Sequence, residues 1–424
     1  MKRFLALLLV VTMMASLVAC SSDNKGNTEK KTETPTTETP ADNKTEAPAD
    51  SKTEAPADNN ASTEGNVKDS VSFTDTSLFK VVEDLTKEVS FNEYYGGFGI
   101  DCNMKIRSKG SAQWIGEGTV PLQTAKKKYK IGYSAYYTID EVSAMYLAGI
   151  QDAAKELGVE LLVNDANYDQ NHQNQAIEQW ITEGVDAVIL SACDFYGIKP
   201  ALDALEKAGI PTVTYDSAPC AGSIDSCVVY DAKEQGRMAA EILEDHLKGK
   251  NAEMKGTIYY GTLPFVHPNA VTREAGFHEV FDKYPDIKIK ALTGNSPEDH
   301  YTAFEGILMA DKDIIGLWGL YSSATYGIMN VVKATGVDYP ITSVDNDRVI
   351  LEGISKGEVV GSCCTNAIEG SRLAMLLTIK LIEGEEVPGI VYQTNTKVGP
   401  DNVEKLFPEY YHGQTLAEYS AGQN

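Results

Sequence analysis

The chain has 424 residues, a formal net charge of −24, seven cysteines and six histidines. Its length accommodates two domains of ordinary size. Its acidity argues against a nucleic-acid partner, because phosphate binding requires clustered lysine and arginine. No cysteine pair has Cys-x-x-Cys spacing and the histidines do not cluster with the cysteines, so we expect neither a metal nor another cofactor.

The N-terminus has the pattern of an export signal. Lys2 and Arg3 precede an apolar stretch, 4–14, that is too short to cross a bilayer as a stable helix. The tetrapeptide Leu-Val-Ala-Cys that ends at Cys20 resembles the bacterial lipobox. This resemblance implies that residues 1–20 are a lipoprotein signal peptide and that Cys20 is acylated with palmitate or a similar chain. An ordinary signal peptide with an incidental cysteine is the alternative.

The next segment, 21–66, is rich in Thr, Glu, Pro, Ala, Asp, Asn and Lys, and it repeats Thr-Glu-Ala-Pro-Ala-Asp at 45–50 and 53–58. Such a composition cannot bury enough apolar surface to offset the entropy of ordering. We predict a disordered tether that holds a folded domain away from the membrane anchor; a spacer without a geometric role predicts the same composition. The Tyr- and Gly-rich segment 67–125 receives no assignment.

From Lys130 onward the pattern is regular, and buried strands alternate with amphipathic helices. Strands are predicted at 131–136, 159–163, 186–191, 211–215, 257–261, 287–292, 314–320, 341–344, 358–364 and 390–398. Helices are predicted at 141–157, 171–183, 198–208, 232–248, 270–283, 299–310, 323–335, 346–355 and 367–383. This alternation predicts an α/β fold with two doubly wound parallel-sheet lobes.

The two lobes are expected to be joined by a hinge that the chain crosses several times. We predict an N-terminal lobe at 126–230 plus 366–397 and a C-terminal lobe at 231–365 plus 398–412. Ligands of open parallel sheets bind beyond the carboxyl ends of the strands, so two facing edges predict a binding cleft.

Four segments in this order carry a resemblance to a known family. They are Lys-Tyr-Lys-Ile-Gly-Tyr-Ser at 128–134, Ala-Gly-Ile-Pro-Thr-Val-Thr-Tyr-Asp at 208–216, Arg-Glu-Ala-Gly-Phe at 273–277 and Ser-Val-Asp-Asn at 343–346. From about Lys130 to Val398 the chain resembles the type I periplasmic binding proteins of the ribose and galactose group. The resemblance implies a solute-binding protein that holds a monosaccharide between two lobes.

In the N-terminal lobe the resemblance assigns sugar contacts to Tyr136 and Asp140, which follow the first strand, and to Asp216, which ends the fourth. A carboxylate can accept two hydroxyl protons in one plane. Ribose-binding members often place an arginine after this last aspartate, whereas this chain has Ser217. The departure weakens a simple ribose assignment.

In the C-terminal lobe the segment around His267, Asn269 and Arg273 resembles the galactose- and glucose-binding members, in which all three positions contact the sugar. The arginine fork suits hydroxyl and ring oxygens. Tyr301 matches the family's aromatic residue that stacks on a pyranose, and Asp345 matches its second hydroxyl-binding carboxylate.

Two family positions are altered. Tyr321 replaces an asparagine, and Cys-Cys-Thr-Asn at 363–366 replaces a glutamine or asparagine, with Asn366 as the expected contact. A tyrosine, together with a disulfide between the adjacent Cys363 and Cys364, would make the pocket more apolar and suit a deoxy sugar or another modified ligand. Two reduced, buried thiols are the alternative for this cysteine pair.

An even number of cysteines remains once Cys20 is lipidated, which permits disulfides in an exported protein. Cys220 and Cys227 enclose a short loop, and we consider a bridge between them.

The carboxylates and a histidine could also supply an acid and a base, but the sequence has no nucleophile elbow, glycine-rich phosphate loop or metal-ligand spacing. We therefore predict a monomeric binding protein and no enzyme. We expect it at the extracellular face of the membrane of a Gram-positive type cell, which it contacts only through its lipid. It would deliver its sugar to an ABC permease with its ATPase. A sensor that presents the sugar to a membrane histidine kinase is the alternative.

Overall fold

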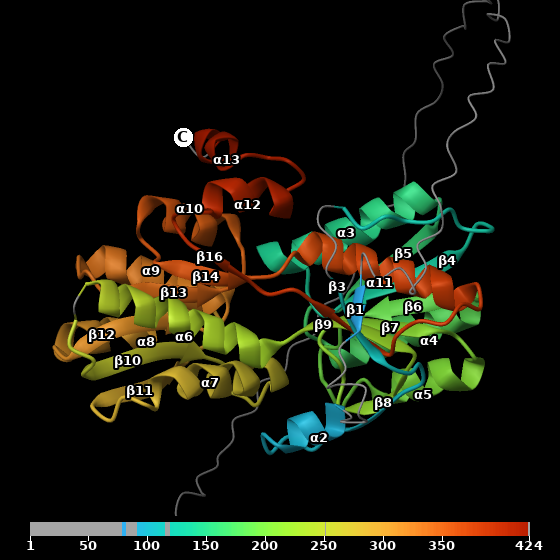
Figure 1. The fold of residues 1–424 in the computed structure, drawn as a ribbon. Coiled ribbons are helices and arrows are strands. Elements are labelled where there is room, and N and C mark those ends of the chain that lie inside the picture. The colour runs from blue at the N-terminus through green and yellow to red at the C-terminus, as the bar shows by residue number, and fades with distance from the viewer. Residues whose placement is uncertain (1–78, 82–90, 115–118, 251, 423–424) are drawn as a thin grey trace, which may run out of the picture. The chain divides into compact units, whose positions relative to one another are not determined.

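The computed structural model describes residues 79–81, 91–114, 119–250 and 252–422. The predicted signal peptide, Cys20 and the predicted tether lie outside these residues. Within them the chain forms an eight-stranded sheet, a six-stranded sheet and a two-stranded sheet, and helices cover both faces of the two larger sheets (Figure 1). The predicted two-lobed α/β architecture is confirmed.

The first lobe is built on the eight-stranded sheet, whose strands follow the order β1-β3-β15-β9-β7-β6-β4-β5. All neighbours are parallel except β1 and β3. The strands are β1 (Phe79–Val81), β3 (Ser111–Trp114), β4 (Lys130–Ala135), β5 (Glu160–Asp165), β6 (Ala187–Leu190), β7 (Thr212–Asp216), β9 (Ser226–Tyr230) and β15 (Ile390–Gln393).

The second lobe is built on the six-stranded sheet in the order β11-β10-β12-β13-β14-β16, with only the last pair antiparallel. Its strands are β10 (Gly256–Thr262), β11 (Ile287–Thr293), β12 (Ile314–Gly319), β13 (Ile341–Val344), β14 (Gly361–Cys364) and β16 (Thr396–Val398). The predicted single strand 390–398 is wrong, because β15 lies in one sheet and β16 in the other.

The helices begin and end close to the predicted positions. They are α3 (Glu141–Leu157), α4 (Gln170–Glu183), α5 (Lys199–Ala208) and α11 (Ala367–Ile382) in the first lobe, and α6 (Ala232–Gly249), α7 (Pro268–Phe281), α8 (Pro297–Ala310), α9 (Ser322–Thr335) and α10 (Arg348–Lys356) in the second. Five of them end at a glycine in the left-handed region, which accepts the last turn without a Cβ clash. Because a glycine marks the end of each of these helices, the sequence predicted their positions well.

The chain passes between the two large sheets at three places: after β9, after β14 and between β15 and β16. The third passage is held from both sides. Thr394 donates to the carbonyl of Trp114 at 2.9 Å, and Asn395 donates to the carbonyl of Asp231 at 2.9 Å. It therefore lies at 394–395, a few residues before the predicted boundary at 397/398.

The segment 67–125, which received no assignment, supplies β1, β3, β2 (Asn103–Ile106) and α2 (Phe91–Gly96). β3 adds to the edge of the first sheet beside β15, and β2 pairs with β8 (Ala221–Ile224) in the two-stranded sheet. Tyr95, Ile100 and Met104 are buried in an apolar cluster with first-lobe residues such as Leu202 and Ile224. We name residues 91–114 the N-terminal extension; it folds as part of the first lobe.

A disulfide joins this extension to the first lobe, between Cys102 and Cys220. The predicted bridge from Cys220 to Cys227 is wrong, since Cys227 is a free, buried thiol on β9. Cys363 and Cys364 are also free and buried, which supports the alternative of two reduced thiols. The partner of Cys220 was missed because it lies 118 residues away, in the segment whose fold the pattern did not reveal.

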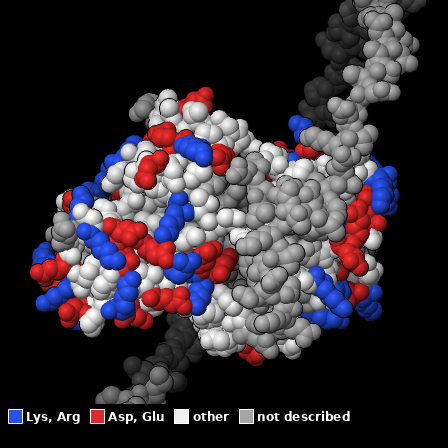
Figure 2. Space-filling view, in the orientation of Figure 1, with Lys and Arg blue, Asp and Glu red and all other residues white. Residues whose placement is uncertain are grey.

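Two short helices close the chain: α12 (Val403–Tyr410) and α13 (Leu416–Gly422), which both contact α10 (Figure 1). In the part of the chain that the structure describes, no helix has the length and apolar character needed to cross a membrane. On the face shown in Figure 2, lysine and arginine alternate with aspartate and glutamate over the second lobe.

Candidate functional site

Two aspartates occupy equivalent places, one in each lobe. Asp216 ends β7 and Asp345 directly follows β13. Their φ angles are 75° and 84°, so both are non-glycine residues in the left-handed region, which aspartate tolerates better than most residues. Such strained backbone concentrates at functional sites.

The Asp216 carboxylate is buried and surrounded by phenols. Its Oδ1 atom accepts hydrogen bonds from the hydroxyls of Tyr146 and Tyr230, both at 2.9 Å. Burial raises the pKa of Asp216, while the two tyrosines and the charge of Arg273 oppose that rise. Ser217, which departs from the ribose-binding pattern, donates to Oδ2 of Asp216 at 3.4 Å.

The start of α7 brings second-lobe residues to this first-lobe carboxylate. Asn269 is buried, and its Nδ2 donates to the hydroxyl of Tyr230 at 3.0 Å. His267 caps the helix, since its Nδ1 accepts from the backbone N–H of Asn269, and its ring meets Phe195 of the first lobe edge to face. Burial and the nearby charge of Arg273 lower the pKa of His267 to about 3, so the imidazole is neutral at neutral pH.

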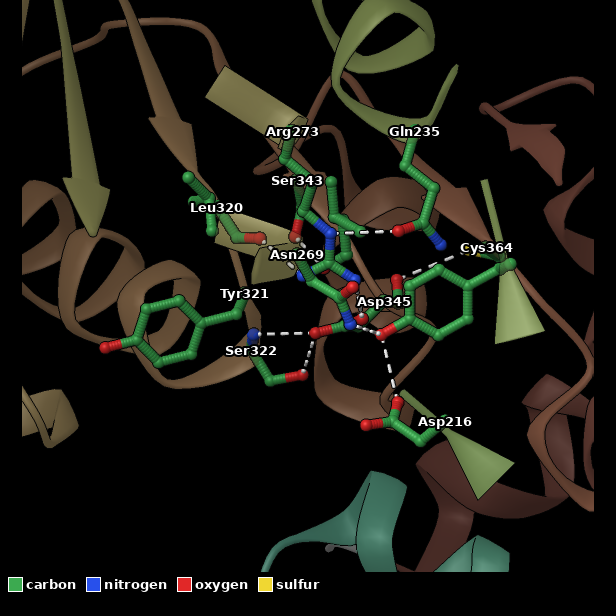
Figure 3. A network of polar contacts seen from close by, with 12 residues as sticks. Asp216, Gln235, Asn269, Arg273, Leu320, Tyr321, Ser322, Ser343, Asp345 and Cys364 are labelled. Carbon is green, nitrogen blue, oxygen red and sulfur yellow. Dashed lines mark hydrogen bonds and ion pairs between the residues drawn. The ribbon is translucent and has the colours of Figure 1, made fainter. Parts of the chain in front are cut away.

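Arg273 lies at the centre of the network in Figure 3. Its Nε donates to Oε1 of Gln235 and its Nη1 to the carbonyl of Leu320, both at 2.9 Å. Its Nη2 lies 3.6 Å from Oδ1 of Asp345, and its guanidinium lies 5.4 Å from the ring centre of Tyr230. The arginine is buried, and the charges of Asp345 and Asp216 act on its guanidinium.

A close helix crossing fixes the position of Arg273. A Cβ on Gly236 of α6 would lie 1.8 Å from the carbonyl oxygen of Arg273, and one on Gly276 of α7 would lie 1.9 Å from the carbonyl oxygen of Lys233. Only glycine permits this approach of the two backbones. The crossing sets Gln235 beside the arginine, so the fork is oriented before any ligand arrives.

The carboxylate of Asp345 is held by the start of α9. Its Oδ2 accepts from the backbone N–H of Ser322 at 3.0 Å and from the hydroxyl of Ser322 at 3.1 Å. Its Oδ1 faces Arg273. One oxygen is thereby assigned to the helix start and the other to the arginine.

Two further predicted residues, Tyr136 and Asp140, approach the network from the first lobe. Asp140 caps α3 by accepting from the N–H of Ser143 at 2.7 Å, and burial, with the charge of Asp345 as a smaller cause, raises its pKa. The hydroxyl of Tyr136 accepts from that of Ser143 at 3.3 Å. Burial, and then the charges of Asp216 and Asp140, raise the pKa of Tyr136.

Three predicted contacts do not join this network. Tyr301 points its hydroxyl to Glu305 on the exposed side of α8, and Asn366 caps α11 while it donates to the carbonyl of Glu409. Tyr321 bonds to His300 and to the carbonyl of Gly294, and its ring points away from Arg273 in Figure 3. The cysteine ring that was one of two alternatives for this wall is absent, since Cys363 and Cys364 are free thiols.

The sequence did not identify several members of the network: Tyr146, Tyr230, Gln235 and Ser322. Tyr230 was missed because β9 was not predicted, although an aromatic residue at the end of an apolar run was a usable signal. Tyr146, Gln235 and Ser322 lie on helices, where only the tertiary packing decides which face meets the strand ends.

The chemistry of the network is that of binding. A buried and two half-buried carboxylates, from Asp216, Asp345 and Asp140, and a buried arginine present acceptors and donors in fixed directions. This suits a neutral ligand with several hydroxyl groups. Among the described residues, no group of three His, Cys, Asp or Glu side chains could hold a metal ion.

A sequence profile of the family described as "Periplasmic binding protein domain" matches residues 131–386. The chain belongs to this family. Periplasmic binding proteins are solute-binding proteins rather than enzymes, and the resemblance noted in the sequence is confirmed at the level of the family.

Several curated relatives are sugar-binding components of importers. The ribose import binding protein RbsB of Bacillus subtilis is 26% identical over 256 residues, which cover 58% of this chain and 82% of the relative. The D-galactose/methyl-galactoside binding protein MglB of Haemophilus influenzae is 26% identical and covers 60% and 82%. The xylitol-binding protein of Mycolicibacterium smegmatis is 25% identical and covers 60% and 73%.

Solved structures support the same fold. A protein from Mycobacterium smegmatis in complex with β-D-fucofuranose matches with a TM-score of 0.61 at 24% identity, over 66% of this chain and 94% of that one. A carbohydrate transporter solute-binding protein from Agrobacterium radiobacter, in complex with D-arabinose, matches with a TM-score of 0.62 at 19% identity, over 68% and 99%. These periplasmic binding proteins are covered almost entirely, whereas a third of this chain lies beyond the match.

Proposed function

We propose that this periplasmic binding protein captures a monosaccharide and delivers it to an ABC permease and its ATPase. The observation that carries the proposal is the meeting of polar side chains from both lobes: Asp216 and Tyr230 from the first, Asn269, Arg273 and Asp345 from the second. Relatives that bind ribose, galactose and xylitol belong to the same family.

The direction of the donors and acceptors fits a polyol or a sugar ring. Arg273 donates the N–H of Nε and one N–H of Nη1 to the protein, and its Nη2 forms an ion pair with Asp345. The second N–H of Nη1 and the N–H groups of Nη2 can donate to ligand oxygens. The carboxylates of Asp216 and Asp140 accept hydroxyl protons from the opposite side. Because residues from two lobes contact the ligand, binding favours the juxtaposed lobes over separated ones.

A thermal-shift screen of the full-length protein against D-ribose, D-galactose, xylitol and D-apiose tests the proposal, followed by calorimetry. A ligand that binds only the folded state at a hundred times its Kd stabilises that state by about 2.7 kcal/mol. We expect at least one monosaccharide to raise the melting temperature and to bind with one site per chain. The absence of any shift across an extended panel of pentoses, hexoses and deoxy sugars would contradict the proposal.

We also propose that the protein acts as a monomer, lipid-anchored through Cys20 at the extracellular face of a Gram-positive type membrane. The lipobox-like tetrapeptide and the short apolar stretch before it support this location. Replacement of Cys20 by serine is expected to release the protein into the medium and to abolish labelling by radioactive palmitate. Retention of the Cys20→Ser protein at the membrane would refute lipid anchoring.

Measurement of sugar uptake in cells that lack the gene distinguishes import from sensing. Deletion of the gene should abolish accumulation of the labelled sugar and leave transcription of other genes unaffected when that sugar is supplied by another transporter. Normal uptake with a lost transcriptional response would favour a sensor that presents the sugar to a membrane histidine kinase.

A further inference from the structure

A second buried aspartate lies directly behind the one that faces Arg273. Asp347 is completely shielded from solvent, and its Oδ1 accepts from the hydroxyl of Tyr326 at 2.6 Å. Its Oδ2 is hydrogen-bonded to the hydroxyl of Ser322, the same hydroxyl that lies 3.1 Å from Oδ2 of Asp345. One serine hydroxyl therefore bridges two carboxyl groups.

This bridge contains two hydrogen bonds but only one hydroxyl hydrogen, so one of the two carboxyl groups must supply the second hydrogen. Two oxygen–oxygen contacts meet at the Ser322 hydroxyl, which carries a single hydrogen and can donate to only one carboxyl oxygen. The other contact is a hydrogen bond only if that carboxyl group is protonated and donates to the serine oxygen. Two ionised carboxylates across one hydroxyl would instead repel each other, and the charge of Asp347 would be fully shielded from water.

The surroundings decide which aspartate carries the proton. Asp345 faces the cation of Arg273 with one oxygen, and with the other it accepts the backbone N–H of Ser322, so a cation and a donor already serve this carboxyl group. Asp347 is buried, and Arg348, its neighbour in the chain, already pairs with Glu141 of the first lobe and lies 4.0 Å above the ring of Tyr411. Burial and the charge of Asp345 raise the pKa of Asp347 to about 8.

We propose that Asp347 is a protonated carboxylic acid at neutral pH and acts as a positioning residue: it donates to Ser322, whose hydroxyl then donates to Asp345. The inference rests on the proposed function in that Asp345 contacts the sugar. In this chain of hydrogen bonds Asp345 is held with one oxygen against the start of α9 and the other toward Arg273. Loss of the Asp347 proton breaks one of these two hydrogen bonds, because the Ser322 hydroxyl can then donate to only one of the two carboxylates.

The phenols and the thiol around Asp347 do not change charge in the same range. Tyr326 on α9, Tyr411 and Tyr419 in the C-terminal segment, and the thiol of Cys364 on β14 all have raised pKa values, chiefly through burial, and they stay neutral. Glu141 on α3 is engaged by Arg348 through both its backbone and side-chain donors. A titration near pH 8 in this region therefore reports on Asp347.

The sign of the linked stability follows from the raised pKa. Since folding raises the pKa of Asp347 above its unfolded value, its favourable contribution is complete below the unfolded pKa of about 3.9 and is lost as the pH rises through about 8. The Asp347→Asn variant should lack this dependence, because the amide donates to Ser322 at every pH while its oxygen still accepts from Tyr326.

Carbon-13 NMR of ligand-free, full-length protein labelled at the aspartate carboxyl carbons tests the proton directly. We expect one resonance to titrate with a midpoint near pH 8 and to disappear in Asp347→Asn, while Asp203→Asn, which removes an exposed aspartate, leaves it in place. The Asp345 resonance, assigned with Asp345→Asn, should shift with the same midpoint. In Ser322→Ala the Asp347 titration should remain, and Asp345 should no longer follow it.

Calorimetry with D-ribose and D-galactose at about pH 6.5 and about pH 9 tests the consequence for binding. Wild-type affinity should fall by up to about tenfold at the higher pH, whereas Asp347→Asn should bind equally well at both. The inference is overturned if no aspartate resonance sensitive to Asp347→Asn titrates between about pH 7 and pH 9, or if Asp345 does not respond to it. If neither sugar binds at either pH, the monosaccharide proposal fails for these two sugars, and the NMR titration still decides the role of Asp347.

Discussion

The two strand-end aspartates share a backbone conformation and differ in everything that surrounds their carboxylates. Asp216 in the first lobe is bonded by two neutral phenols and lies at one end of the network. Asp345 in the second lobe faces a buried arginine and a helix start. The repeated lobe architecture thus supplies two equivalent positions, and the helices packed on each sheet decide how the charge is held.

The largest effect is expected from removal of the cation on which the second-lobe aspartate depends. Arg273→Met leaves Asp345 without a countercharge and deprives Gln235 and the Leu320 carbonyl of their donor. We expect a loss of about 3 kcal/mol in the free energy of unfolding and at least a hundredfold weaker sugar binding. Chemical denaturation and calorimetry measure the two quantities.

The matched control is Arg237→Met on the neighbouring helix, where the arginine is exposed and pairs with Glu241 and Glu234. It should change stability by less than about 1 kcal/mol and leave binding intact. Equal losses of stability and sugar affinity in Arg273→Met and Arg237→Met would show that the buried arginine contributes no more to the site than a surface arginine does.

A direct comparison of Asp345→Asn with Asp216→Asn should separate the carboxylate that is paired with an arginine from the one that is bonded to two tyrosines. Asp345→Asn leaves the charge of Arg273 buried without its partner and should cost about 2 kcal/mol of stability. Asp216→Asn should cost less than about 1 kcal/mol at pH 7, because the amide oxygen still accepts from both tyrosines. Sugar affinity should fall in both variants.

The pH dependence of Asp216→Asn sharpens this contrast. Folding raises the pKa of Asp216, so its favourable contribution is complete below the unfolded pKa of about 3.9 and is lost as the pH rises through the folded value. Relative to wild type, the variant should therefore become more stable between about pH 4 and pH 7. Denaturation curves at both pH values measure this, and an opposite slope would show that the phenols hold the group ionised.

A smaller effect is expected from the contact that joins the lobes beside the aspartates. Glu141 at the start of α3 accepts from both the backbone N–H and the guanidinium of Arg348 at the start of α10, so a first-lobe carboxylate caps a second-lobe helix. A double-mutant cycle of Glu141→Gln and Arg348→Met should give a coupling of about 0.5–1 kcal/mol in sugar binding. A coupling near zero would mean that this cap does not stabilise the juxtaposed lobes.

The smallest effect is expected at Tyr301, which the family resemblance places on the sugar. Tyr301→Ala removes the ring, whose hydroxyl faces Glu305 outside the network, and the affinity for any bound sugar should change by less than about twofold. A large loss of affinity would place this ring at the ligand after all and would restore the sequence-based assignment.

The regular part of the chain could be predicted because its signals are local. Glycines such as Gly158, Gly184 and Gly336 end helices wherever they stand, and buried parallel strands appear as short apolar runs. Asp216 and Asp345 were assigned through the family resemblance, and both lie at the carboxyl ends of strands that such runs predicted. Local signals also explain the error at 390–398, where one continuous pattern contains a change of sheet.

The remaining features depend on which distant segments meet. The link from Cys102 to Cys220 joins residues 118 positions apart, and the strands of the N-terminal extension find their partners only when the first sheet is complete. Tyr230, Ser322 and Asp347 acquire their roles from neighbours that no spacing rule connects. The sequence by itself determined the two lobes and the ends of their strands, because periodicity and capping act within a few residues. Only the tertiary structure decided which side chains share a proton and which carboxylate faces the arginine, because hydrogen bonds and burial depend on packing across the whole domain.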